Sequence, residues 1–332
     1  MKVAVVEGER KIAVREAPEP VPERDEVVIQ VQYCGICGSD LEIYSSGANI
    51  RPGHEYAGDI VEVGSEVQGW KAGERVVVQP RRPCGRCYWC GNGYEIGLCE
   101  QFYVELLRYG GAFATYAKAK HDQLYRIPGD LSYEHATIAQ PMSTPLCALR
   151  ASGMQLGDTV MVLGQGPIGL LQAHVARLAG ARAVYATELS RKRIELARSM
   201  GVEVIDINKT DPVDRITELT GGRRADVVFE CSGSPAASLQ SLALVRNGGT
   251  VVFVGICMDW AELPISKIAL NGLTLKGLVA YHESDFATAL NLIIEKKLDV
   301  APLITSTMPL EDISRAFEKA SKGEEGKVLI KP

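Results

Sequence analysis

The stretch TVMVLGQGPIG at residues 159–169 decides the fold of this chain. An apolar, β-branched run leads into a turn with the pattern G-x-G-x-x-G, formed by Gly164, Gly166 and Gly169. The first glycine permits a tight turn, the second lets a pyrophosphate approach the backbone, and the third allows a helix to pack closely on a strand. The stretch therefore predicts a dinucleotide-binding unit that begins strand–turn–helix.

The residues after the turn support this interpretation. Pro167 and Ile168 open the expected helix, where a missing N–H costs little and the helix N-terminus attracts phosphate. The next predicted strand, 183–187, ends in Glu188, about 20 residues further on, where an acid binds the ribose hydroxyls of NAD. The basic run 191–193 would tolerate a 2′-phosphate, so NAD is favoured and NADP stays open. The alternative is a tight turn without a ligand.

Outward from this turn, strands alternate with helices, which is typical of a parallel sheet covered by helices. The first 145 residues read instead as short strands separated by glycine and proline, which favours a β barrel or sandwich. We expect strands at 27–33, 56–63, 75–79, 159–163, 183–186, 225–229, 250–255 and 327–330, and helices at 168–179, 191–200, 236–244, 285–296 and 310–320.

The length of the chain bears on the number of domains, and its net charge bears on the kind of partner. A chain of 332 residues is long for one core, so two domains are expected. Its net charge of −5 argues against nucleic acid as a partner, because phosphate binding needs a basic surface. We also expect no secretory signal and no membrane span, and hence a cytoplasmic protein.

Two groups of cysteines suggest metal sites. Cys84, Cys87, Cys90 and Cys99 could form a closed, structural tetrahedral zinc site, with disulfides or an iron–sulfur cluster as alternatives. The segment CGICGSD at 34–40 and the later His54–Glu55 could form a zinc site with an open position. By spacing alone this second group is weak: a buried cysteine near a satisfied histidine is at least as common, and a redox pair of Cys34 and Cys37 is disfavoured because no helix is expected after it.

Taken in order, these segments resemble the zinc-containing medium-chain dehydrogenases, such as the alcohol, sorbitol, threonine and glucose dehydrogenases. Further segments of the resemblance are GHEYAG at 53–58, GGAFA at 110–114 and ECSG at 230–233, so it covers nearly the whole chain. It implies an α/β plus β protein: a GroES-like, β-rich catalytic domain at 1–147, a Rossmann domain with a doubly wound parallel sheet at 148–280, and a segment at 281–332 that returns to the catalytic domain.

The resemblance implies roles residue by residue. Cys37 and His54 match the ligands of a catalytic zinc, and Glu55 matches a carboxylate that binds the metal in some members and lies beside it in others. Asp40 matches the acid that orients the histidine, and Ser39 matches the hydroxyl that passes on the alcohol proton. Cys34 has no role in the family and is interpreted as structural.

Other matched positions depart from the family or concern the cofactor. Gln140 stands where a third zinc ligand varies among Cys, Asp and Glu, and its amide oxygen is a weaker ligand. Glu42 stands where a histidine often ends the proton relay. Thr144 matches a residue of the nicotinamide pocket, and Arg193 matches a basic residue near the adenosine ribose.

The resulting hypothesis is an oxidoreductase that transfers a hydride between a polyol or secondary alcohol and NAD(P), with two zinc ions per chain. A first alternative is a sugar dehydrogenase acting on an anomeric hydroxyl, for which Gln140 is the hint. A second alternative is a nucleotide-binding relative that has lost the chemistry. The family also implies a small-molecule substrate and a homo-oligomer, either dimer or tetramer.

Overall fold

The computed structural model describes residues 1–80, 82–102 and 109–332, and the chain divides into two compact units. One unit combines residues 1–141 with 282–332, and the other comprises 142–281. The first division falls inside the continuous helix α5 (Ala139–Ser152), a few residues before the expected limit at 147.

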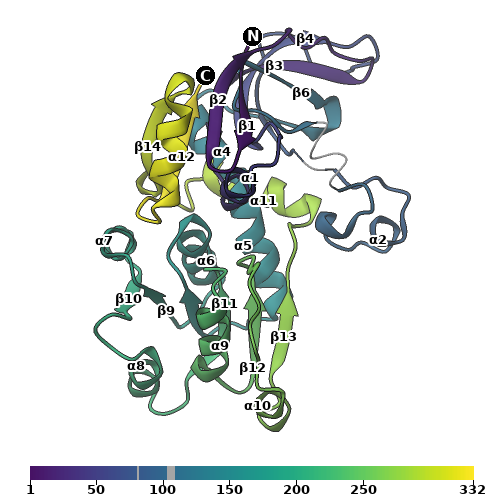
Figure 1. Ribbon diagram of the computed structural model, residues 1–332. Coiled ribbons are helices and arrows are strands. Elements are labelled where there is room, and N and C mark those ends of the chain that lie inside the picture. The colour runs from purple at the N-terminus through teal and green to yellow at the C-terminus, as the bar shows by residue number, and fades with distance from the viewer. Residues whose placement is uncertain (81, 103–108) are drawn as a thin grey trace. The chain divides into compact units, whose positions relative to one another are not determined.

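The unit 142–281 contains a six-stranded sheet in the order β10-β9-β8-β11-β12-β13, with every neighbouring pair parallel. Counted along the chain this is the order 3-2-1-4-5-6, so the prediction of a doubly wound parallel sheet is confirmed (Figure 1). The strands are β8 (Thr159–Leu163), β9 (Ala183–Glu188), β10 (Glu203–Asp206), β11 (Ala225–Glu230), β12 (Val245–Phe253) and β13 (Thr274–Gly277).

Helices alternate with these strands, and apolar side chains from both bury each other. The helices are α6 (Pro167–Leu178), α7 (Arg191–Ser199), α8 (Pro212–Leu219), α9 (Pro235–Leu244) and α10 (Ile265–Leu270). Met161 and Leu163 of β8, Ile216 of α8 and Val228 of β11 belong to one buried cluster. The carboxyl end of β8, where the glycine turn begins, is therefore supported by a packed core.

The unit 1–141 with 282–332 is built around β3, which pairs with three strands, β4, β6 and β15, all antiparallel. Its larger sheet has the order β14-β15-β3-β4-β5-β7, with β6 attached to β3, and β1 pairs with β2. The strands are β1 (Lys2–Gly8), β2 (Lys11–Glu16), β3 (Glu26–Gly35), β4 (Glu55–Val63), β5 (Arg75–Val78), β6 (Tyr116–Lys120), β7 (Leu124–Arg126), β14 (Ile304–Pro309) and β15 (Lys327–Lys331).

Short helices connect or cover these strands. They are α1 (Gly38–Ser46), α2 (Tyr88–Gly91), α4 (Tyr133–Thr137), α11 (Glu283–Ile294) and α12 (Ile313–Ser321), with 3-10 turns η1 (Ile96–Leu98), η2 (His121–Gln123), η3 (Ala301–Leu303) and η4 (Leu310–Asp312). Helix α1 corrects one expectation, because a helix does follow Cys37 directly. Tyr44 of α1 and Phe317 of α12 pack edge to face, with ring centroids 5.3 Å apart.

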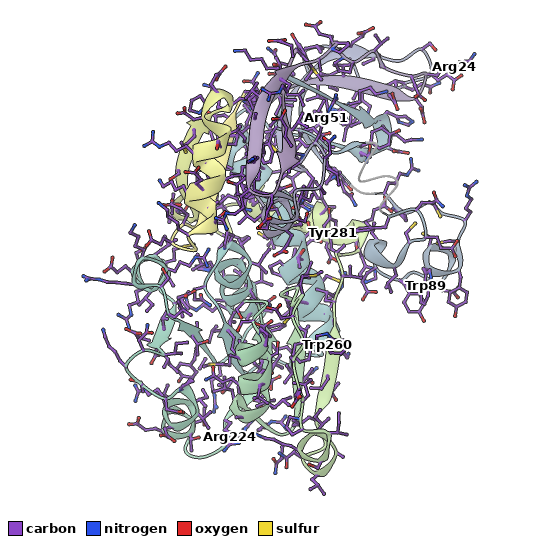
Figure 2. All side chains as sticks on the ribbon, viewed as in Figure 1. Arg24, Arg51, Trp89, Arg224, Trp260 and Tyr281 are labelled. Atoms are coloured by element: carbon purple, nitrogen blue, oxygen red, sulfur yellow. The ribbon has the colours of Figure 1, made fainter. Side chains whose placement is uncertain are left out.

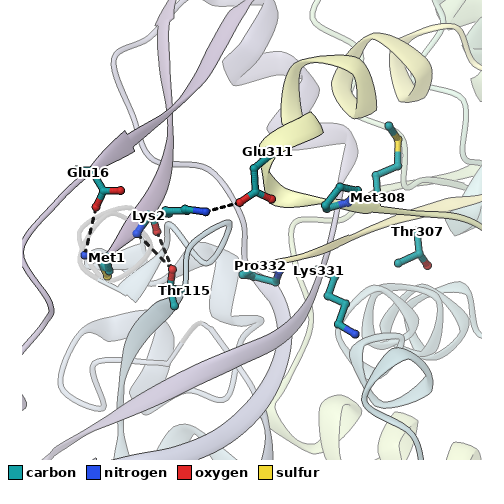
Figure 3. Close-up of a pocket in the computed structure, with 10 residues that line it drawn as sticks. Met1, Lys2, Glu16, Thr115, Thr307, Met308, Glu311, Lys331 and Pro332 are labelled. Carbon is teal, nitrogen blue, oxygen red and sulfur yellow. Dashed lines mark hydrogen bonds and ion pairs between the residues drawn. The ribbon is translucent and has the colours of Figure 1, made fainter.

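The C-terminal segment belongs to the same unit as the N-terminus. Strand β15 is hydrogen-bonded to the end of β3, with Leu329 opposite Gly35 and Ile330 opposite Cys34. Lys2 Nζ also lies 2.5 Å from Glu311 Oε1 beside the surface pocket that Figure 3 shows. Both chain ends thus belong to one unit, and the residues of β15 are brought to the end of β3.

Among the described residues, no helix combines the length and the apolar composition that crossing a bilayer requires.

Candidate metal and dinucleotide sites

The segment that carries Cys37 leaves β3 and turns directly into α1. Cys37 is the N-cap of this helix, with φ −100° and ψ 160°. Asp40, in the first turn, accepts a hydrogen bond from the Cys37 backbone N–H at 2.9 Å. The helix start therefore fixes the position of the thiol by a side chain three residues further on.

The second segment begins with Gly53, whose φ of +104° is in the left-handed region that favours glycine. Its N–H donates to Asp40 Oδ1 at 3.0 Å, and His54 Nδ1 lies 3.4 Å from the same oxygen. Glu55 then starts β4, where it lies opposite Gly35 at the end of β3. Asp40 thus ties the segment of Cys37 to the segment of His54.

Cys37, His54 and Glu55 form a cluster whose ligand atoms all lie within 4.8 Å of one another. His54 and Glu55 are buried, and Cys37 is half-buried. Burial alone would lower the pKa of His54, but the adjacent Asp40 carboxylate and Cys37 thiol outweigh it and raise the pKa to about 10. Burial opposes ionisation of Cys37, yet its hydrogen bond to His54 lowers the pKa of the thiol. Both shifts favour a charged, polar cluster in the interior.

Lys327 of β15 also reaches this cluster, and sequence reasoning missed it. Its Nζ lies 2.9 Å from Glu55 Oε1 and 2.7 Å from Glu55 Oε2, and the side chain is 2% exposed. A buried lysine is normally paired with an acidic side chain. The position of Lys327 in the apolar strand run KVLIK was therefore the available sign that this lysine is buried and paired. Nothing in the sequence could indicate its partner, which lies 272 positions away.

For the remaining predicted site residues, the structure gives the element and the burial of each side chain. Ser39 is half-buried and Glu42 is exposed, both on α1. Gln140 is buried near the start of α5, and Thr144 is half-buried two residues inside the other unit. Cys34 is fully buried, and burial raises the pKa of its thiol, which agrees with a structural role.

The four cysteines of the lobe around α2 and η1 also converge. The sulfur atoms of Cys84, Cys87, Cys90 and Cys99 all lie within 4.8 Å of one another. Backbone N–H groups of Cys90 and Glu100 lower the pKa of Cys87 to about 6, and the Cys84 N–H points at Cys99 Sγ at 3.4 Å. Four converging thiols with N–H donors match the donor set of a tetrahedral metal site with four cysteine ligands.

The glycine-rich turn has the geometry that its three glycines predict. Gly164 has a φ of +84°, and a Cβ on Gly169 would overlap the carbonyl oxygen of Gly164, so helix and strand pack at the closest distance. The atoms nearest to where a Cβ on Gly166 would be belong to the guanidinium of Arg193, at about 3.5 Å. The backbone at Gly166 is therefore open to a phosphate, with a cation beside it.

Glu188, the acid predicted to bind ribose, is the last residue of β9. Its Oε2 accepts the Gln165 N–H at 2.8 Å, and its Oε1 accepts the N–H groups of Leu189 and Ser190 at 2.7 and 2.9 Å. Glu230 ends β11, on the other side of β8, and holds the next loop in the same way through Ser232 and Gly233. Buried carboxylates thus shape the ends of the strands on both sides of β8, and the order of the sheet reverses between β8 and β11.

Comparison with known proteins agrees with this architecture. Residues 23–129 match the alcohol dehydrogenase GroES-like domain, and residues 167–295 match the zinc-binding dehydrogenase domain. The sorbitol dehydrogenase of Bacillus subtilis (strain 168) is 36% identical over 346 aligned residues, which cover 100% of this chain and 97% of that protein.

Two solved structures extend the agreement to three dimensions. The 2R,3R-butanediol dehydrogenase of Bacillus subtilis superimposes with a TM-score of 0.89 at 33% identity, over 100% of this chain and 99% of that one. A protein from Sinorhizobium meliloti 1021, bound to NADP, superimposes with a TM-score of 0.92 at 30% identity, over 100% and 99% of the two chains. Sequence and fold together place the chain in the zinc-containing medium-chain alcohol and polyol dehydrogenase family, as a zinc-dependent oxidoreductase that uses NAD(P).

Proposed function

We propose that the chain transfers a hydride between a polyol or another secondary alcohol and NAD(P), at a zinc ion held by Cys37, His54 and Glu55. One observation carries this proposal: the ligand atoms of the three side chains lie within 4.8 Å of one another in a buried cluster. Sorbitol dehydrogenase and (R,R)-butanediol dehydrogenase, at 36% and 34% identity, support the substrate class. A non-catalytic relative would not need this complete cluster.

The donor set fits zinc. Thiolate, imidazole and carboxylate are the ligands of catalytic zinc sites, which keep a position open for substrate. Gln140 is 4% exposed and would add a neutral amide oxygen. A bound zinc supplies Lewis acidity, which makes an alcohol oxygen easier to deprotonate.

Residues of α1 supply the path for the proton. Ser39 and Glu42 are three positions apart, so they lie on the same side of the helix, one half-buried and the other exposed. We infer that the Ser39 hydroxyl takes the alcohol proton and that Glu42 passes it to water. Asp40 accepts from His54 Nδ1, which leaves Nε2 of the imidazole available to the metal.

The cofactor proposal is NAD in preference to NADP. Glu188 is 7% exposed and held by three backbone N–H groups, so its charge is fixed where the adenosine ribose would lie. A carboxylate accepts hydrogen bonds from ribose hydroxyls and repels a 2′-phosphate. Gly164, Gly166, Pro167, Ile168 and Gly169 would hold the pyrophosphate, with Arg193 beside it and Thr144 at the nicotinamide.

The four-cysteine lobe is proposed to hold a second, structural zinc. With all four positions of the ion taken by sulfur, none remains for substrate. Reduced thiols are needed for this, so a reducing compartment such as the cytoplasm is part of the proposal.

We further propose a homo-oligomer. In the stretch from β12 to the end of α10, five large apolar side chains are exposed, namely Ile256, Met258, Trp260, Ile265 and Leu270. Trp260, labelled in Figure 2, is 99% exposed. Several exposed apolar side chains within one short stretch of chain are what a protein–protein contact would bury. Light scattering on the purified chain tests this, and a monomer at all concentrations would contradict it.

One screen tests the function. The purified chain is assayed for NADH and NADPH formation with polyols, simple secondary alcohols and aldose sugars, and its zinc content is measured. We expect turnover with polyols or secondary alcohols and about two zinc per chain. Turnover with sugars alone would favour the anomeric-hydroxyl alternative, for which Gln140 is the residue to test. A zinc-loaded chain that turns over none of these substrates would contradict the proposal.

A further inference from the structure

Lys327 is an ammonium group enclosed within the unit that carries the Cys37 cluster. The side chain is 2% exposed and stands at the start of β15, the terminal strand that pairs with β3. Burial opposes a positive charge, so the interior must compensate it. The proposed catalytic roles given above do not use this residue.

The contacts of Lys327 account for all its hydrogen-bonding capacity. Its Nζ donates to the Ile36 carbonyl at 3.0 Å and to Glu55 Oε1 and Oε2 at 2.9 and 2.7 Å. An ammonium has three donors, and here each has one acceptor. Ile36 directly precedes Cys37, so one cation holds the backbone beside one proposed ligand and the carboxylate of another.

Gly35 shows how closely this pair is packed. A Cβ at Gly35 would overlap Glu55 Oε2 and would lie 3.3 Å from Lys327 Cδ. The φ of Gly35 is not in the left-handed region, so the lack of a side chain serves space and not backbone conformation. The end of β3 is therefore shaped around the Glu55–Lys327 pair.

We propose that Lys327 is a positioning residue for the cluster of Cys37, His54 and Glu55, an inference that rests on the proposed zinc site. Lys327 holds Glu55 by both oxygens and the Cys37 segment by the Ile36 carbonyl, and its charge lowers the affinity of the cluster for a divalent cation. The reason is competition: a carboxylate shared with an ammonium has less charge to offer a metal, and two cations beside one carboxylate repel each other. Lys327 thus sets how firmly Glu55 binds the metal.

The test measures zinc affinity of the full chain in zinc buffers set with a chelator. Zinc retained per chain is followed against free Zn²⁺, and the transition that disappears in Cys37→Ser is assigned to the cluster. In Lys327→Gln we expect this transition at about tenfold lower free Zn²⁺, because the repulsion between the ammonium and the metal ion is removed. The four-cysteine transition should stay in place.

Two control variants isolate the charge at this position. Lys327→Arg keeps a cation and should stay close to the wild type. Lys331→Met removes an exposed ammonium from the same strand and should cause no shift. A shift in Lys331→Met equal to that in Lys327→Gln would overturn the inference, because the effect would then belong to net charge alone.

A third comparison covers the case in which Lys327→Gln does not fold, since it leaves Glu55 buried without its cation. The double variant Lys327→Gln/Glu55→Gln leaves no unpaired charge in this pair and should bind zinc more tightly than Glu55→Gln. Unchanged or weaker zinc binding in either comparison would overturn the role of Lys327. A wild-type chain that shows no Cys37-dependent transition would instead overturn the proposed zinc site itself.

Discussion

Asp40 is the residue on which the geometry of the proposed zinc cluster most depends. Its carboxylate accepts the backbone N–H of Cys37 and of Gly53, and it lies 3.4 Å from His54 Nδ1. Burial opposes its charge, but His54 and the two N–H donors outweigh this and lower the pKa of the carboxyl. One side chain therefore fixes both segments and the orientation of the imidazole.

We predict that Asp40→Asn weakens zinc binding at the cluster about 10–100-fold, with a parallel loss of turnover. The amide would present N–H to at least one donor that the carboxylate now accepts. Zinc retention in chelator buffers measures the effect. Asp25→Asn, which removes a carboxylate paired with Lys120, is the control and should bind zinc normally. Normal zinc affinity in Asp40→Asn would show that Asp40 does not organise the site.

The preference between the two nicotinamide cofactors is predicted to depend on Glu188. In Glu188→Ala, affinity for NADH should fall about tenfold, the cost of losing hydrogen bonds to a charged acceptor, while affinity for NADPH falls less or rises. Fluorescence titration with both cofactors gives the ratio. Glu195→Ala, an exposed partner of Arg191, should leave it unchanged. Equal losses for both cofactors would mean that Glu188 only supports the turn.

At the residue scale, the sequence could predict those site residues that lie in short motifs. Cys37, Asp40 and His54 stand in two recognisable segments, and the structure brings those segments together. The partner of Lys327 could not be predicted, because their contact comes from the pairing of β15 with β3, which no local pattern encodes. Residues that act through tertiary contact carry no spacing signal.

Among the elements, the junction of β8 with α6 is the least tolerant of added volume. A Cβ at Gly169 would overlap the Gly164 carbonyl, so in Gly169→Ala the helix must move off the turn. We expect a loss of about 1–3 kcal/mol in stability, the usual cost of overpacking, and weaker binding of both cofactors. Thermal unfolding and NADH titration measure these. Gly277→Ala in β13, where a Cβ meets nothing within 4 Å, is the control. Normal stability and binding in Gly169→Ala would contradict the close packing.

The four-cysteine lobe is predicted to contribute to stability and not to the chemistry. Cys87→Ser should lose about one zinc per chain and unfold at a lower temperature, because the metal supplies part of the lobe's folding free energy. Molecules that stay folded should keep turnover. Cys257→Ser, outside both cysteine groups, should change neither property. A Cys87→Ser variant with normal stability but no turnover would assign the lobe a catalytic role.

Elements with strong patterns were predicted and weakly patterned ones were missed. The turn at Gly164, strand β8 and helix α6 agree with expectation within a residue or two. Strands β10 and β13, of four residues each, and helix α8, of barely two turns, were missed, but so were the longer β1 and α5. Helix α8 is begun by Asp211, which accepts two backbone N–H groups, and Ile216 fixes it in the core. Tertiary packing stabilises such short elements, and periodicity does not reveal them.

At the scale of the whole molecule, the residues proposed to bind zinc and those proposed to bind the cofactor belong to different compact units. Every proposed zinc ligand lies in residues 1–141, and every proposed cofactor residue lies in 142–281. Each set is also held by its own interactions: Asp40 and Lys327 at the cluster, and Glu188 at the glycine turn. The dinucleotide site should therefore keep its shape when the metal is removed.

We predict that a chelator strong enough to remove zinc from the Cys37 cluster abolishes turnover but leaves NADH binding within about twofold, since no proposed contact to the dinucleotide uses a zinc ligand. NADH fluorescence and zinc content are followed in the same samples. Restoring Zn²⁺ should restore turnover, and a chelator already saturated with Zn²⁺ is the control. Parallel loss of NADH binding and zinc would show that the metal shapes the nucleotide site, and the division of tasks between the units would be wrong.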